Sequence, residues 1–442
     1  MTSRRWVRTV KAMSQAPRPT LRPRSVLAAL LLLVPLAACA SPEGSETGAP
    51  ALAADAPLPT TVPKGTKLIV GDPPTKVALQ LSGEIGKFSF DIEWANLSGG
   101  PQTSEAFRAD ALDVGAVAEI PPIHAVWTDL PAKIVASKFR QDPLAHPTYE
   151  LGVAPGVSVR ALADLRGKKI AYSPGQAQGA LVLKALKKAG LTKDDVTLVE
   201  LPSTGDVYPN ALASKQVDVA PIGGVNIKRY LTKFGRDGAT TIAHGIRDDP
   251  GHLYVRTTTL RDPAKAAAIR EYVAAWAKAA RWVYEHPKEW IEGYYVKDQG
   301  LTAADGEYLV KQAGEPDIPA DWADAIRRHQ ETIDILAAET GNPPLRAEDL
   351  YDLRYEAVGA QAVEGRSGAG AAGGSGDVTQ GESTDAAPQA PSANTVAGRS
   401  AGAAPQAGLA GAGRSSDAIE GRSAGGAYQV RLTATGSQGA PR

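Results

Sequence analysis

The chain has 442 residues, of which 48 are basic and 48 acidic, so its formal net charge is zero. A neutral chain has neither the basic surface of nucleic-acid-binding proteins nor the acidic excess of a solvating protein, so we expect no nucleic-acid partner. Cys39 is the single cysteine, which excludes an internal disulfide and leaves packing to stabilise the fold.

Residues 1–38 have the pattern of an export signal. Several basic residues precede an apolar run, 26–36, that is too short to cross a bilayer. The run closes with Leu36, two alanines and Cys39, which resembles the lipobox of bacterial lipoproteins, a family in which the cysteine receives a diacylglyceryl group. We therefore expect a signal peptide over 1–38, lipidation of Cys39 and a lipoprotein anchored to the outer face of a cell membrane. The alternative is an ordinary secretory signal with a chance cysteine.

Two polar segments flank the part of the chain that has the composition of a folded protein. Residues 39–65 are rich in Ala, Pro, Gly, Ser and Thr, which is typical of a flexible tether. Residues 361–442 have too few large apolar side chains to offset the entropy of ordering, so we expect a disordered tail. The roughly 300 residues between them are enough for two domains.

In this central part, apolar runs of strand length alternate with helical patterns. Strands are expected at 67–70, 88–94, 114–117, 133–136, 151–154, 169–172, 196–201 and 217–222. Helices are expected at 179–189, from Pro263 to Pro287, at 302–312 and at 320–339. The alternation predicts an α/β fold with mostly parallel sheets that helices cover on both faces.

One pattern occurs twice. Residues 104–117 and 208–222 each contain a helix, a polar residue and the start of a strand with an aspartate between apolar residues, Asp113 and Asp218. Two similar α/β lobes are the simplest explanation, and a chance likeness between two helix-strand units is the alternative.

Several segments, in this order, resemble the substrate-binding proteins of ABC importers for aliphatic sulfonates, taurine and nitrate. They are SGGP at 98–101, LDVG at 112–115, EIPP at 119–122, the stretch 159–190 with DLRGKKI, and the late helix 276–290 that closes with HPKEW. The resemblance extends over about 67–357. It implies a two-lobed periplasmic-binding-protein-like fold of type II, with two crossover hinge strands and a helical C-terminal part.

The resemblance also implies how the chain is divided and what it works with. Lobe I is expected at 66–152, lobe II at 153–249, and the return to lobe I with the C-terminal helices at 250–360. The protein is then a monomer that captures a small-molecule ligand between its lobes and delivers it to the permease and ATPase of an importer. We expect an organosulfur anion as the ligand, and no catalytic residue, cofactor or metal.

Ligands of open α/β sheets bind at the carboxyl ends of the strands, where helix N-termini offer N–H donors. A sulfonate stays charged at every physiological pH, so it needs donors rather than a base. Three loops meet this requirement, and they supply the candidate ligand-binding residues Asp72, Pro73 and Lys76, then Ser98, Gly99 and Gly100, then Ser173, Gly175, Gln176 and Gln178. Each loop is also compatible with a plain turn that caps a helix.

Other candidate residues lie near these loops. Glu119, Ile120 and Pro121 are expected at the rim of lobe I, where Glu119 binds either a ligand amine or a neighbouring lysine. The related proteins often carry an aromatic or charged group where this chain has Gly223 and Gly224. The loss of bulk at these two glycines predicts a larger or flatter ligand.

Three other hypotheses remain open at this stage, and one of them is a sensory or adaptor lipoprotein with no transport partner. A thiamine-precursor pyrimidine or another small heterocycle would use an aromatic sandwich, for which the chain offers Trp94, Trp127, Tyr172 and Tyr208. An enzyme on the same fold would need His and Cys near the site, and Cys39 is assigned to the anchor. The sequence has no zinc-like His/Cys spacing, no GxSxG elbow and no Walker loop.

Overall fold

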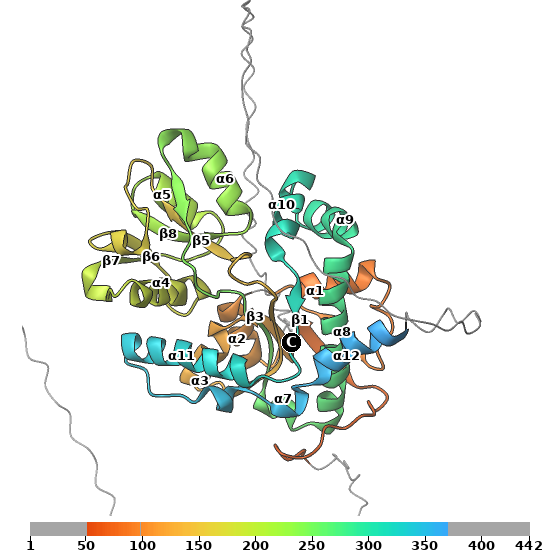
Figure 1. Ribbon diagram of the computed structural model, residues 1–442. Coiled ribbons are helices and arrows are strands. Elements are labelled where there is room, and N and C mark those ends of the chain that lie inside the picture. The colour runs from red at the N-terminus through yellow and green to blue at the C-terminus, as the bar shows by residue number, and fades with distance from the viewer. Residues whose placement is uncertain (1–50, 98, 370–442) are drawn as a thin grey trace, which may run out of the picture. The chain divides into compact units, whose positions relative to one another are not determined.

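The computed structural model describes residues 51–97 and 99–369 (Figure 1). These residues form two β-sheets with helices packed around them. The first sheet has the strand order β11-β4-β10-β3-β1-β2, and the second has the order β7-β6-β8-β5-β9. Within the described ranges, every helix is too short or too polar to span a bilayer.

The strands of the first sheet are β1 (Lys67–Gly71), β2 (Asp91–Trp94), β3 (Val114–Ala118), β4 (Ala132–Arg140), β10 (Gly251–Arg256) and β11 (Pro316–Asp317). Those of the second are β5 (Tyr149–Val153), β6 (Lys169–Tyr172), β7 (Thr197–Glu200), β8 (Val219–Gly223) and β9 (Thr240–Ile242). The 3-10 turns are η1 (Leu162–Leu165), η2 (Lys193–Asp195), η3 (Gly235–Asp237), η5 (Ala347–Leu350) and η6 (Leu353–Tyr355).

The helices before the long α8 are α1 (Pro73–Leu81), α2 (Gly100–Arg108), α3 (Ile120–Trp127), α4 (Ala177–Lys188), α5 (Val207–Ala213), α6 (Val225–Phe234) and α7 (Thr257–Leu260). They are followed by α8 (Pro263–Glu285), α9 (Pro287–Trp290), the π-helix η4 (Ile291–Asp298), α10 (Ala303–Ala313), α11 (Ala323–Thr340) and α12 (Val358–Ala369). The start of α8 is the N-cap that the sequence predicts, because Asp262 accepts the N–H groups of Ala264 and Lys265.

All the expected strands are present, but the expectation of mostly parallel sheets is wrong. β1 pairs in parallel with β2 and β3, and β6 pairs in parallel with β7 and β8. β10 runs antiparallel to β3 and β4, while β5 runs antiparallel to β8 and β9. The antiparallel strands β4, β5, β9 and β10 are those that lead the chain from one sheet to the other, so connectivity and not local pattern sets their direction.

The repeated helix-strand pattern has a common hydrogen-bonding role in both sheets. Asp113 accepts the N–H of Ile69 at 3.0 Å, and its own N–H donates to the Ile69 carbonyl at 2.9 Å. Asp218 forms the same pair with Lys169, at 2.8 Å and 2.7 Å. Each aspartate therefore ties the start of its strand to the first parallel strand of its sheet, which confirms that the two units are alike.

The segment expected to be a flexible tether is packed where the structure describes it. Leu58 and Val62 lie against the core of the first sheet, and the N–H of Leu52 donates to the Arg261 carbonyl at 2.6 Å. Arg354 donates to the carbonyl groups of Ala53 and Ala56. Composition alone does not predict this packing, because a few apolar side chains are enough to order an extended segment. Residues 39–50 lie outside the described residues.

The expected start of the disordered tail at 361 is also wrong, because α12 continues to Ala369. Gly359 lets this helix approach closely, since a Cβ there would lie 3.1 Å from Ile318 and 3.5 Å from Ala277 on α8. A sequence rich in Ala and Gly is a weak helix signal by itself, and packing on α8 supplies the missing stabilisation. The remainder of the predicted tail lies outside the described residues.

Two crossovers connect the sheets, from β4 to β5 and from β9 to β10, and adjacent aspartates join them. Asp248 accepts the N–H groups of Thr148 and Tyr149 at 2.9 and 2.8 Å. Asp249 accepts the N–H of Arg140 at 2.8 Å. The side chains of Asp248 and Asp249 are 5% and 0% exposed, so these bonds are shielded from water. The second crossover thus holds the first through these backbone N–H groups and through a 2.9 Å hydrogen bond between His244 Nε2 and the Tyr149 carbonyl.

Replacing Asp248 by Asn tests this joint. An amide oxygen retains one acceptor, whereas its NH₂ group faces the second backbone N–H without a partner, so we expect a loss of about 1–3 kcal/mol in the free energy of unfolding. Urea unfolding measures it, with Asp237→Asn on the exposed η3 turn as the matched control. Equal stabilities of the two variants would contradict a structural role for Asp248.

Candidate functional site

The carboxyl ends of β7 and β8 frame a pocket of about 330 Å³ beside the first crossover, which we call the second-sheet pocket. Three of the predicted residues, Gln178, Gly223 and Gly224, line it. Its other lining residues are Thr148, Tyr149, Ser203, Gly205, Tyr208, Pro209, Pro221, Ile222 and Asn226. The lining offers hydroxyl, amide and backbone donors, and no charged side chain is among these residues.

The two glycines do not both enlarge this pocket. A Cβ on Gly223 would lie 2.7 Å from the Tyr149 ring and 2.8 Å from the Thr148 carbonyl oxygen. The missing side chain at Gly223 therefore makes room for the crossover, and the larger or flatter ligand expected from these two glycines stays a prediction. Gly224 has φ +56°, which favours glycine, and its nearest outside neighbour is Leu309 on α10.

The loop before α4 faces the other half of the molecule. Ser173 is buried, and Gln176 is the N-cap residue of α4. Gly175 has φ +78°, and a Cβ on it would lie 3.4 Å from the His124 ring on α3. The loop is therefore in contact with α3, and of its predicted residues only Gln178 reaches the second-sheet pocket within the described part of the chain.

The loop before α1 lacks the N–H donors that we expected there. Pro73 and Pro74 have no N–H, and the N–H of Thr75 donates to the Asp72 side chain at 3.3 Å. The N–H of Lys76 donates to the Asp72 carbonyl at 3.1 Å. Expecting free backbone donors at this helix N-terminus was wrong, because two prolines and the Asp72 cap use up all four positions.

The other predicted residues of the first lobe are close to one another. Gly99 has φ +84° and precedes α2, and a Cβ on Gly100 would lie 2.6 Å from the Pro121 ring. Ile120 is buried in the core of the first sheet. This contact joins the glycine loop to the start of α3, whereas Ser98 lies outside the described residues.

Glu119 has a neighbouring lysine as its partner in this structure. Its carboxylate accepts from Lys184 Nζ at 2.8 Å and from the Thr332 hydroxyl at 2.6 Å. Burial alone would raise the pKa of Glu119, but the charges of Lys184 and His329 and the two hydrogen bonds hold it below the usual value. Glu119 directly follows β3 of the first sheet, whereas Lys184 lies on α4, which packs on the second sheet. The ion pair between them therefore links the two sheets.

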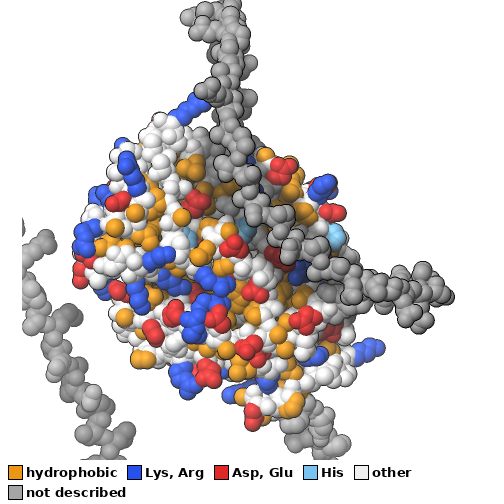
Figure 2. Space-filling model, in the orientation of Figure 1, with side chains coloured by type: hydrophobic (Ala, Val, Ile, Leu, Met, Phe, Trp, Pro, Cys, Tyr) orange, Lys and Arg blue, Asp and Glu red, His pale blue; other side chains and the backbone are white. Residues whose placement is uncertain are grey.

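Basic side chains surround this contact on the molecular surface. A hollow of about 440 Å³ lies between α4 and α11, and Lys184, Lys187, Lys188 and Arg328 line it. Figure 2 shows Lys and Arg side chains gathered along this seam. A further hollow next to Glu119, between the end of β3, α4 and the second crossover, is only about 20 Å³ and has space for about one water.

The sequence analysis missed a second pocket of about 430 Å³, which lies among α1, β4, α8, η4 and α10. We call it the first-sheet pocket. Lys138 and Arg140 at the end of β4 line it together with Trp290, Tyr294 and Tyr295. A lysine inside the apolar run of β4 was the available signal, and an apolar strand by itself gives no indication of where that lysine points.

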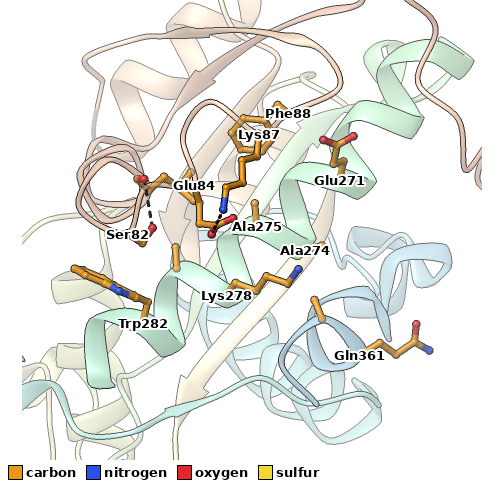
Figure 3. A pocket seen from close by; sticks show the side chains of 13 residues that line it. Ser82, Glu84, Lys87, Phe88, Glu271, Ala274, Ala275, Lys278, Trp282 and Gln361 are labelled. Carbon is orange, nitrogen blue, oxygen red and sulfur yellow. Dashed lines mark hydrogen bonds and ion pairs between the residues drawn. The ribbon is translucent and has the colours of Figure 1, made fainter. Parts of the chain in front are cut away.

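A third hollow, of about 650 Å³, lies between α1, α8 and α12 (Figure 3). Phe88 and Trp282 line it, as does the Lys87–Glu84 ion pair of 2.7 Å. None of the predicted ligand-binding residues lines this hollow. We therefore do not assign it to the functional site.

Residues 141–290 match the family model described as NMT1/THI5 like. This NMT1/THI5-like segment contains the whole second sheet, both crossovers and α8. A protein of Escherichia coli (strain K12) named for binding aliphatic sulfonates is 31% identical over 105 residues, which are 24% of this chain and 32% of the relative. That match therefore spans about a third of the curated relative.

Solved structures resemble the chain over a greater length. The alkanesulfonate-binding protein SsuA from Xanthomonas axonopodis pv. citri, bound to MOPS, has a TM-score of 0.54 and 22% identity, over 65% of this chain and 99% of that structure. The periplasmic aliphatic sulphonate binding protein SsuA from Escherichia coli has a TM-score of 0.53 and 20% identity, over 75% and 98%. These matches confirm the two-lobed periplasmic-binding-protein fold around the NMT1/THI5-like segment.

Replacing Glu119 by Gln tests the link between the sheets. At pH 7 we expect a loss of about 3 kcal/mol in the free energy of unfolding, because Lys184 is left without its counter-charge. The folded pKa lies below the unfolded one, so the contribution is complete above about pH 4.5 and is lost as the pH falls through the folded value.

The measurement is urea unfolding of both proteins from pH 7 down to pH 3. Glu348→Gln, which removes an exposed partner of Arg346, is the control and should cost much less. A constant difference between Glu119→Gln and the unmodified protein over this range would contradict the assignment.

Proposed function

We propose that this protein is the extracytoplasmic solute-binding component of an ABC importer, which captures a small organosulfur anion between its lobes. The observation that carries the proposal is a pair of sheets that two crossovers join in the described part of the chain, with Glu119 after β3 in contact with Lys184 on α4. Contacts across the division, such as Glu119 with Lys184, are those of a closed trap. The proposed partners are the permease and the ATPase of the importer.

The relatives support a binding role. The Escherichia coli relative and both solved structures are named for binding sulfonates. Their names are the basis for proposing an aliphatic sulfonate or a similar anion here. We also propose that the protein works without a catalytic residue, cofactor or metal.

The donors near the division suit a small polar solute. Gln178 and Asn226 supply amides, and Ser203 and Tyr208 supply hydroxyl groups to the second-sheet pocket. The glycine loop at Gly99 and Gly100, the α1 loop with Asp72, Pro73 and Lys76, and the α4 loop with Ser173, Gly175 and Gln176 remain proposed contacts. In the closed arrangement these loops would surround a ligand on several sides.

A pyrimidine or another small heterocycle is the second candidate ligand. Tyr149 and Tyr208 line the same pocket, and two aromatic side chains are what a planar ring requires. Trp94, which the sequence analysis also considered, is in contact with Tyr272 in a T-shaped pair at 6.1 Å. Of the aromatic residues proposed from the sequence, Tyr208 is the one that lines this pocket.

A binding role is preferred over an enzymatic one. The pair of Ser137 and His252, 2.9 Å apart, is the arrangement closest to a nucleophile and its base, but each side chain is 2% exposed. His252 stacks on His329, and burial lowers the pKa of His252 to about 3. A solute does not reach these groups in the closed arrangement, so they serve packing.

A ligand panel tests the proposal. Alkanesulfonates, taurine, sulfate, nitrate and pyrimidines are added to the mature protein, and its thermal unfolding is followed. A ligand at 100 times its Kd should raise the free energy of unfolding by about 2.7 kcal/mol. The variant Gln178→Ala should respond less, whereas Gln299→Ala, a side chain remote from the pocket, should respond like the unmodified protein. No shift with any compound would contradict solute binding.

The anchor is tested separately, since Cys39 lies outside the described residues. We propose that Cys39 carries the lipid and holds the receptor at the membrane, with residues 1–38 removed. Replacing Cys39 by Ser should abolish labelling with a radioactive fatty acid and move the protein from the membrane fraction to the soluble fraction. Labelling that survives the change would contradict lipidation at this residue, and solute binding should be unaffected.

A further inference from the structure

An organic anion needs a cation or a set of free N–H groups, and the second-sheet pocket offers no charged side chain. The first-sheet pocket has both a charge and the size of a ligand site. Its volume is about 430 Å³, within the usual range for small-molecule sites, roughly 300–1,000 Å³. Lys138 and Arg140, among the last three residues of β4 before the crossover, line it.

Lys138 is a cation without a matching carboxylate. Over residues 51–97 and 99–369, its Nζ forms no ion pair, and its nearest aromatic contact is the Trp276 ring, 4.8 Å from Nζ to the ring centroid. Burial lowers the pKa of Lys138, while Asp72 raises it. A half-buried ammonium in this setting gains most from an anion that enters the pocket.

Asp72 is the acidic group that acts on Lys138, and each charge shifts the pKa of the other toward the ionised form, but the two do not form an ion pair in the described part of the chain. Asp72 is bound to the hydroxyl of Tyr272 at 3.0 Å and to the N–H of Thr75, and burial raises its pKa. Asp249 lines the pocket, but its carboxylate accepts from Arg247 at 2.9 Å and from the N–H of Arg140. The guanidinium of Arg140 donates to the His146 carbonyl and likewise has no carboxylate partner among the described residues. Among the residues that line the pocket, the two cations Lys138 and Arg140 thus outnumber the single carboxylate, Asp249.

The opposite wall is aromatic. Trp290 and Tyr294 are stacked with their ring centroids 4.3 Å apart, and Tyr295 lies beside Tyr294 at 5.2 Å. The π-helix η4 begins directly after Trp290 and places both tyrosines on the pocket. π-helical turns are rare and often occur at functional sites. Val283 and Val310 complete this apolar wall. The ammonium group of taurine would have no carboxylate partner on it.

We propose that the first-sheet pocket is a binding site for an organic monoanion with an aromatic or bulky apolar body, whose charged head pairs with Lys138 and Arg140. The body lies against Trp290 and Tyr294. The inference rests on the proposed function, because it names the class of solute that the receptor takes. It differs from the sequence-based site, since the decisive contacts come from β4 and η4.

The test uses the mature full-length protein and isothermal titration with naphthalene-1-sulfonate, butane-1-sulfonate, taurine and the uncharged naphthalene-1-sulfonamide. We expect naphthalene-1-sulfonate to bind at least tenfold more tightly than butane-1-sulfonate and the sulfonamide, and taurine to bind most weakly. Lys138→Met removes the charge and keeps an apolar side chain of similar length. It should weaken naphthalene-1-sulfonate binding at least tenfold.

Two further variants keep the result interpretable if Lys138→Met fails to fold. Tyr294→Ala shortens the aromatic wall, and it should weaken the aryl compound more than the alkyl one. Lys311→Met removes an exposed lysine of α10 that does not line the pocket, and it should bind like the unmodified protein. Circular dichroism of each variant verifies that it is folded.

The outcomes separate the two proposals. Binding of alkyl sulfonates with no binding of the aryl compound would overturn the inference and leave the proposed function intact. Aryl binding that Lys138→Met and Tyr294→Ala leave unchanged would also overturn the inference alone. If no sulfonate of either kind binds, both proposals fail together.

Discussion

The joint between the two sheets depends on two adjacent carboxylates that accept backbone N–H groups. Asp248 and Asp249 sit on the second crossover and bind the backbone of the first, at Thr148, Tyr149 and Arg140. Asp249 also pairs with Arg247 at 2.9 Å, and His244 Nε2 lies 3.3 Å from Asp248, so both buried carboxylates have side-chain partners as well. These hydrogen bonds keep the two crossovers side by side. The joint therefore helps to position the two sheets relative to each other.

Charge is distributed unequally around the joint. The second-sheet pocket is lined by neutral donors, and Glu119 neutralises Lys184 between α3 and α4. Lys138 and Arg140, which form no ion pair among residues 51–97 and 99–369, line the first-sheet pocket at the end of the strand that leads into the first crossover. An anion bound at Lys138 would sit close to Arg140, whose N–H is held by Asp249. The proposed anion site therefore lies only a few residues along β4 from the first crossover.

Much of the fold could be predicted from local pattern. The strands, the α8 N-cap at Asp262 and the repeated aspartates Asp113 and Asp218 all follow from residues close together in the chain. The site was harder to predict. Gly223 and Gly224 distinguish the sequence from the related proteins. A Cβ atom would fit at Gly224 but would collide with Tyr149 at Gly223. The α1 loop was correctly identified as a helix start, yet its prolines and the Asp72 cap leave no free N–H.

The sequence by itself determined the α/β class, the duplicated helix-strand unit and the likeness to solute-binding proteins, because these depend on periodicity, caps and short motifs. Tertiary structure alone decided the direction of β4, β5, β9 and β10, the partner of Glu119 and the unpaired state of Lys138. Each of these depends on residues far apart in the chain, such as Glu119 with Thr332, or Lys138 with Trp276. A charged side chain serves binding or structure according to whether folding brings a counter-charge close to it. The distance between two charges far apart in the chain cannot be read from a local sequence pattern.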